Sequence, residues 1–184
     1  MKYVDREIKL PNYWDYKAIF TDLNGTIVPD YDPRHGKAAF QNCIKAVQGK
    51  LRYRLDADRF LISAKMLGMP IALVTDVNQR VVDLFRKSPA ISSAAYFDTL
   101  FNKIFCNDMW KSKGKDKYFG YEMAMEQMGL YPDQVLVFED SKKGIDAARK
   151  AKLDVCVIEN PNIKIAEQDV QKGRFYIESF NNLM

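Results

Sequence analysis

The stretch that most constrains the fold is 18–26, which reads Ala-Ile-Phe-Thr-Asp-Leu-Asn-Gly-Thr. It is a short apolar run that ends abruptly in the carboxylate of Asp22 and in a turn at Gly25. A strand of this kind, buried in a parallel sheet, delivers its last residue to the carboxyl edge, where open α/β sheets bind ligands. We therefore predict a strand over 16–21 and expect Asp22 at a ligand-binding edge.

Apolar runs of strand length alternate with stretches of helical period along the rest of the chain. The pattern predicts strands over 70–75, 102–107, 134–138, 154–158 and 175–177, and helices over 36–48, 57–67, 78–87, 118–129 and after Ser141. The stretch 89–98 is less regular. This rhythm is typical of an α/β fold, a Rossmann-like three-layer α/β/α arrangement around a parallel sheet. The length of 184 residues favours a single domain over 1–184.

Composition excludes several classes of protein. No segment approaches the roughly 18 to 20 apolar residues that span a bilayer. The charged N-terminus lacks the apolar centre of a signal peptide, so we expect a cytoplasmic protein with no membrane partner. The three cysteines show no metal-binding or disulfide spacing and are expected to be reduced thiols, and a single histidine excludes a His-rich metal site.

Polar groups follow four of the predicted strands: Asp22, Thr75, a lysine-rich loop after 102–107, and the pair Glu139 and Asp140. Right-handed crossovers place all of these strand ends on one rim of the sheet. Carboxylates can hold Mg²⁺ and attack phosphorus, while a lysine and a hydroxyl neutralise and bind phosphoryl oxygens. The set therefore indicates phosphoryl transfer.

The spacing of these groups resembles that of the haloacid dehalogenase superfamily. Asp22-Leu-Asn24-Gly25-Thr26 is similar to the family's first motif, and Thr75 to its second. The run that starts at Glu139 reads Glu-Asp-Ser-Lys-Lys-Gly-Ile-Asp-Ala-Ala, which resembles the β-phosphoglucomutase-like branch. The resemblance covers about 17–180.

The resemblance implies a role for each matched residue. Asp22 would be the nucleophile that becomes an aspartyl phosphate, and Thr75 and Lys115 would bind the phosphoryl group. Counting back from the acidic pair selects Lys115, with Lys111, Lys113 and Lys117 as alternatives. The cofactor would be Mg²⁺, with ligands from Asp22, the backbone carbonyl of Asn24, Glu139 and Asp140. The remaining residues expected at the substrate are Gly25, Thr26, Asp76, Arg34 and His35.

One position departs from the family. The phosphatases carry an aspartate two residues after the nucleophile as general acid and base, whereas this chain has Asn24. An amide cannot carry a proton between groups, and such catalysis is worth roughly 10² to 10⁴ in rate. We therefore predict a Mg²⁺-dependent phosphatase with slowed or specialised turnover. The alternatives are a catalytically silent domain that binds a phosphorylated partner, and a phosphotransferase that uses a long-lived aspartyl phosphate.

The insert 27–56 is too short for the helical cap domain of this branch, so we expect a minimal cap of one helix and a loop. A nearly uncapped site admits a phosphorylated small molecule or macromolecule, or needs a second copy of the chain as its lid. The insert is also basic, which would attract a polyanion such as nucleic acid. Its cationic residues are Arg34, Lys37, Lys45, Lys50, Arg52 and Arg54. His35 is a candidate substitute proton donor.

Overall fold

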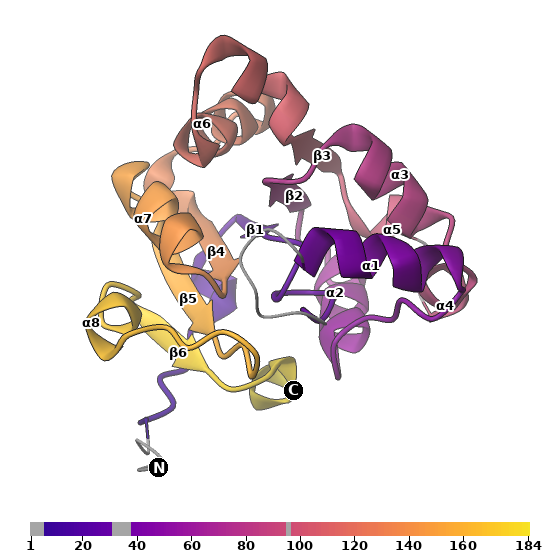
Figure 1. The fold of residues 1–184 in the computed structure, drawn as a ribbon. Coiled ribbons are helices and arrows are strands. Elements are labelled where there is room, and N and C mark those ends of the chain that lie inside the picture. Colours follow the sequence, from indigo (N-terminus) through magenta and orange to yellow (C-terminus); the bar gives the residue numbers. More distant parts are fainter. Residues whose placement is uncertain (1–5, 31–37, 95–96) are drawn as a thin grey trace.

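The fold is built on one six-stranded parallel sheet (Figure 1). The structure, a computed structural model, describes residues 6–30, 38–94 and 97–184. The strands lie in the order β3-β2-β1-β4-β5-β6, and every neighbouring pair is parallel. The order reverses direction between β1 and β4, so the carboxyl ends of these two strands flank the crevice in which open α/β sheets bind ligands.

The strands match the apolar runs in the sequence. They are β1 Ala18–Thr21, β2 Ile71–Thr75, β3 Lys103–Cys106, β4 Val135–Glu139, β5 Asp154–Ile158 and β6 Phe175–Ile177. Every residue of β1, β2 and β4 is buried, as expected for central strands covered on both faces.

The helices connect successive strands. They are α1 Ala38–Val47, α2 Ala57–Met66, α3 Gln79–Arg86, α4 Pro89–Ala94, α5 Phe97–Leu100, α6 Lys117–Met128, α7 Lys142–Lys150 and α8 Glu167–Val170. Short 3-10 turns cover Tyr13–Asp15, Asn107–Met109, Lys111–Lys113, Pro132–Gln134 and Phe180–Leu183.

Two apolar cores lie on opposite faces of the sheet. Ile19 packs in the core that includes Phe60 and Phe85, on the side of α2 and α3. Its neighbour Phe20 packs in the other core, with Tyr121 of α6 and other residues. Figure 1 shows α1–α5 on one side of the sheet and α6 and α7 on the other. The predicted three-layer α/β/α fold is confirmed.

Some local predictions were wrong. The irregular stretch 89–98 contains α4 and the first half of α5, and α8 was not predicted. Leu67 was expected to point inward, but it follows the last residue of α2 and is 62% exposed. In α1 the apolar stripe is not the buried face, because Phe40 and Val47 are exposed while Asn42 and Ala46 are buried.

None of the described helices is long and apolar enough to cross a membrane. Within the described part of the insert 27–56, α1 is the only helix. The role of this insert as a minimal cap stays a prediction.

Candidate active site

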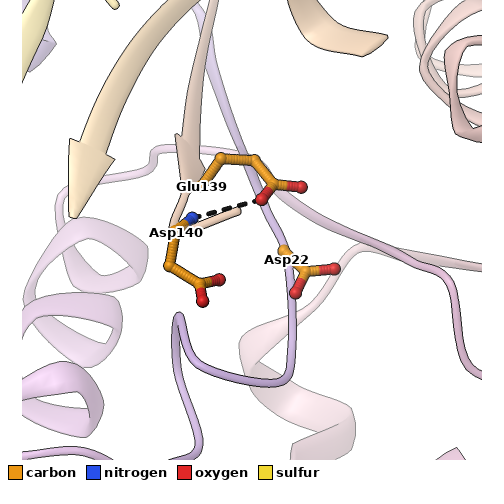
Figure 2. Close-up of side chains that lie close together, drawn as sticks. All are labelled: Asp22, Glu139 and Asp140. Carbon is orange, nitrogen blue, oxygen red and sulfur yellow. Dashed lines mark hydrogen bonds between the residues drawn. The ribbon is translucent and has the colours of Figure 1, made fainter. Parts of the chain in front are cut away.

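Three carboxylates meet where β1 and β4 end. Asp22 follows β1, and its backbone N–H donates to the carbonyl of Phe138 in β4 at 3.1 Å. Glu139 is the last residue of β4, and Asp140 follows it. Figure 2 shows the three side chains converging, and each offers an oxygen within 4.8 Å of the others. The side chains predicted as metal ligands are therefore brought together.

A lysine lies among these carboxylates, and it is Lys117 rather than Lys115. The Lys117 ammonium donates to Asp22 Oδ1 at 2.5 Å and to Glu139 Oε1 at 2.5 Å. Its side chain is 3% exposed. Lys115 is exposed, and its ammonium lies 5.6 Å from the centre of the Phe119 ring. The choice of Lys115 by counting back from the acidic pair was wrong, and one of the alternatives takes its place.

The start of α6 explains this difference. Asp116 caps the helix, with Oδ1 accepting from the backbone N–H of Tyr118 at 3.1 Å, and Lys117 is the first helical residue. Side chains in the first turn point back over the helix N-terminus, which here directs Lys117 toward the sheet edge. Lys115 precedes the cap, where no helical geometry directs its side chain.

Glu139 orients Lys117 and also the start of the loop that follows β4. Its Oε1 also accepts from the Tyr121 hydroxyl at 3.2 Å. Its Oε2 accepts from the backbone N–H of Asp140 at 3.1 Å, drawn in Figure 2, and from the Ser141 hydroxyl at 3.2 Å. Each oxygen of Glu139 thus accepts from at least two protein donors, so Asp22 and Asp140 are the freer ligands.

Asp140 is held by two side chains from other loops. Its Oδ1 accepts from the Thr26 hydroxyl at 2.7 Å, and its Oδ2 from Asn160 Nδ2 at 2.7 Å. A Cβ at Gly25, whose φ is +83°, would lie 2.0 Å from Asp140 Oδ2. The predicted Gly25 and Thr26 therefore surround Asp140, and glycine is required at position 25 by both space and backbone conformation.

Burial and mutual repulsion shift the protonation of this cluster. Burial, with Glu139 nearby, raises the pKa of Asp140 to about 7. Burial also raises the pKa of Asp22, with Glu139 and Asp140 adding to the rise and Lys117 opposing it. Burial lowers the pKa of Lys117, but Asp22 and Glu139 outweigh it and hold that pKa above its usual value. The lysine is therefore charged, and one ammonium faces three acidic groups.

The surplus of acidic groups over the single ammonium is relevant to whether this site suits a metal ion. An all-oxygen set of buried carboxylates, in which the pKa values of Asp22 and Asp140 are raised, suits a hard divalent cation, whose charge would favour the ionised forms. The residues present therefore fit Mg²⁺, with Asp22 and Asp140 as side-chain ligands and Glu139 beside them.

Thr75 and Asp76 lie at the end of β2. Thr75 is 1% exposed, and its hydroxyl accepts from the backbone N–H of Val77 at 3.4 Å. Asp76 forms an ion pair with Lys143 at 2.6 Å, and the pair is solvent-accessible. Because β2 neighbours β1, both residues lie on the same rim as Asp22.

Asn24 lies in the turn after β1 and is half-buried. Its Oδ1 accepts from Asn42 Nδ2 of α1 at 2.7 Å. Arg34 and His35 lie outside the described residues.

Two functional contacts were missed from the sequence. Asn160 also donates to Asp30 Oδ2, at 2.8 Å, and so links the insert to Asp140. Arg54 donates to the carbonyl of Gly25 and, at 2.6 Å, to that of Glu159. Asn160 had a usable signal, because it follows a strand end as Asp22 does, whereas Arg54 was only one cation in a basic insert.

Solved structures with the same fold are distant in sequence. CbbY from Rhodobacter sphaeroides, in complex with phosphate, matches with a TM-score of 0.73 and 17% identity, over 91% of this chain and 96% of that chain. A HAD family hydrolase from Deinococcus radiodurans R1, with bound phosphate and sodium, matches with a TM-score of 0.71 and 14% identity, over 92% and 93%. At these identities the likeness shows the fold alone.

Sequence comparison finds a relative that matches part of the chain and a family that matches most of it. Enolase-phosphatase E1 from Leptospira interrogans is 36% identical over 70 residues, which are 38% of this chain. The matched part spans only 29% of that relative's length. Residues 18–158 match the family described as haloacid dehalogenase-like hydrolase, and this span includes Asp22, Thr75, Lys117 and Asp140. Since the match covers most of the chain and includes the strand ends that build the site, the protein belongs to the haloacid dehalogenase-like hydrolases.

Proposed function

We propose that the protein is a Mg²⁺-dependent phosphomonoester hydrolase that acts through an aspartyl phosphate on Asp22. The observation that carries this proposal is the contact of the Asp22 carboxylate with the Lys117 ammonium at 2.5 Å, beside the acidic pair Glu139 and Asp140. A buried carboxylate beside a fixed ammonium is suited to attack phosphorus while the charge on the phosphoryl oxygens is neutralised.

The reaction would proceed in two displacements. In the first, a carboxylate oxygen of Asp22 bonds to phosphorus as the bond from phosphorus to the leaving oxygen breaks. In the second, water attacks phosphorus, inorganic phosphate leaves, and the carboxylate is restored. Thr75 and Lys117 would bind the phosphoryl oxygens through a hydroxyl and an ammonium. Mg²⁺ held by Asp22, Asp140 and the Asn24 carbonyl would supply further positive charge to these oxygens.

Proton transfer is the part of the reaction that the site is least equipped to catalyse. Asn24 occupies the position from which a carboxyl would protonate the leaving oxygen and later take a proton from water. An amide does neither, so turnover should be slow for leaving groups that are strong bases. Substrates would be phosphorylated small molecules or macromolecules. The names of the partial relative and of the phosphate-bound structural neighbours agree with phosphate chemistry.

The test is the hydrolysis of an aryl phosphate, whose leaving group needs little protonation, with and without Mg²⁺. We expect metal-dependent phosphate release that Asp22→Asn abolishes. Asn24→Asp should increase it by roughly 10²-fold, because a carboxylate at position 24 can take a proton from the attacking water. Release that persists in Asp22→Asn would contradict the proposal. No release even from Asn24→Asp would favour a silent domain that binds a phosphorylated partner.

A second probe addresses phosphotransfer. Acetyl phosphate should label Asp22 only transiently if water completes the reaction. A stable acyl phosphate that passes to an added acceptor would instead indicate a phosphotransferase.

A further inference from the structure

One of the described contacts between the insert and the active site is made by a buried amide. Asn42 of α1 is 0% exposed, and its Nδ2 donates to Asn24 Oδ1 at 2.7 Å. We propose that Asn42 is a positioning residue for Asn24, through which α1 sets the orientation of the side chain in the acid–base position. This inference rests on the proposed function and specifies the class of substrate that its site accepts.

Stability does not explain an asparagine at position 42. Its Oδ1 is buried and has no hydrogen-bond partner among the described groups. A buried unpaired carbonyl oxygen destabilises a fold, whereas an apolar side chain of similar size, such as leucine, carries no such penalty. Ala46, one turn further along α1, is buried in an apolar core. The amide therefore serves its contact with Asn24.

The contact determines which end of the Asn24 amide is left for the substrate. Because Asn24 Oδ1 accepts from Asn42, the Nδ2 of Asn24 remains as a donor. An N–H group directed at a leaving oxygen stabilises negative charge on that oxygen without transferring a proton. The pair therefore favours phosphate esters or anhydrides whose leaving group is a weak base, such as aryl phosphates and acyl phosphates, over alkyl phosphates.

The decisive variant is Asn42→Leu, with Gln41→Leu as the matched control. Gln41 is the adjacent amide on α1 and is half-buried. We expect Asn42→Leu to lower kcat on an aryl phosphate about tenfold, with a smaller change in KM, because the misplaced Asn24 no longer faces the leaving oxygen. The melting temperature should hold or rise, since the unpaired oxygen is removed. Gln41→Leu should leave kcat unchanged.

The directions in which kcat and the melting temperature change distinguish a positioning role of Asn42 from a purely structural one. If kcat and the melting temperature of Asn42→Leu fall together, or if kcat stays at the wild-type value, the inference is wrong. A series of leaving groups gives a further check. The wild-type rate should fall steeply as the leaving group becomes more basic, and Asn24→Asp should flatten that dependence.

A readout that needs no turnover keeps the two proposals distinct. The side-chain amide signal of Asn24 in a ¹⁵N NMR spectrum should shift in Asn42→Leu and remain in place in Gln41→Leu. An unmoved signal in Asn42→Leu would overturn the positioning contact. Absence of Asp22-dependent phosphate release from every ester would instead overturn the proposed function, whatever the NMR signal does.

Discussion

At the scale of single residues, the site depends on the balance between one buried ammonium and three acidic groups. Lys117 contacts Asp22 and Glu139 at the same distance, 2.5 Å. Its positive charge therefore compensates the negative charge of the proposed nucleophile and that of the carboxylate that orients the lysine. Removing a charged partner from a buried pair costs more than the pair itself contributes, because the remaining charges stay buried. Lys117 should therefore matter to both folding and chemistry.

Replacing Lys117 with methionine should lower the free energy of unfolding by about 3 kcal/mol and reduce phosphate release at least roughly 10²-fold. Lys115→Met is the matched control, since that exposed lysine lies two residues away and its ammonium lies over the Phe119 ring rather than among the carboxylates. Urea unfolding and aryl phosphate hydrolysis measure the two effects. Loss of activity in Lys115→Met with retention in Lys117→Met would restore the choice made from sequence counting.

At the scale of elements, α7 is seated against the acidic pair by a glycine. A Cβ at Gly144 would lie 1.8 Å from Glu139 Oε1, and the Gly144 N–H donates to the capping Ser141 hydroxyl at 3.1 Å. The close approach allows α7 to begin directly behind Glu139 and so places the carboxylate against Lys117. Glycine at this position serves the site rather than the helix.

Glycine to alanine inside a helix normally stabilises by roughly 0.5 to 1 kcal/mol. For Gly144→Ala we expect the opposite sign, a lower melting temperature together with weakened phosphate release, because Glu139 must move. Arg149→Ala, on the exposed side of α7, serves as the control and should change neither quantity. A Gly144→Ala protein that is more stable and fully active would show that Glu139 has room to shift.

At the scale of the whole molecule, the buried acidic cluster makes stability depend on pH. Burial raises the pKa of Asp140 from an ordinary value of 3.8 to about 7. The folded protein therefore binds this proton more tightly than the unfolded chain does. The contribution of Asp140 to stability is fully present at low pH and is lost as pH rises from about 4 toward about 7.

Mg²⁺ competes with that proton, since a carboxylate must be ionised to bind a metal. We expect the rise in melting temperature on adding Mg²⁺ to be larger at about pH 8 than at about pH 6. Thermal unfolding with and without the metal at both pH values measures it. Asp140→Asn should abolish most of the rise at either pH. An equal rise at the two pH values in the wild type would contradict the raised pKa.

Much of the fold could be predicted because its signals are local. The apolar runs at 18–21, 71–75 and 135–138 mark central strands, and the polar residues after them mark the functional rim, since parallel strands end on one edge. The helical spacing of apolar residues did not predict which side chains are buried, because burial in a helix depends on the element that packs against it. The apolar residues Phe40 and Val47 are exposed, and the polar Asn42 is buried in the same helix.

By itself, the sequence determined the parallel α/β sheet, the place of Asp22, Thr75, Glu139 and Asp140 on its rim, and the absence of a carboxyl at position 24. Only the tertiary structure decided that Lys117 is the lysine beside Asp22, that Asn160 holds Asp140, and that Asn42 contacts Asn24. The physical reason is the separation along the chain of the residues that interact. Apolar strand runs and the polar residues that follow them are patterns of neighbours along the chain. The contact between Asp22 and Lys117 instead joins residues 95 positions apart and depends on where α6 begins.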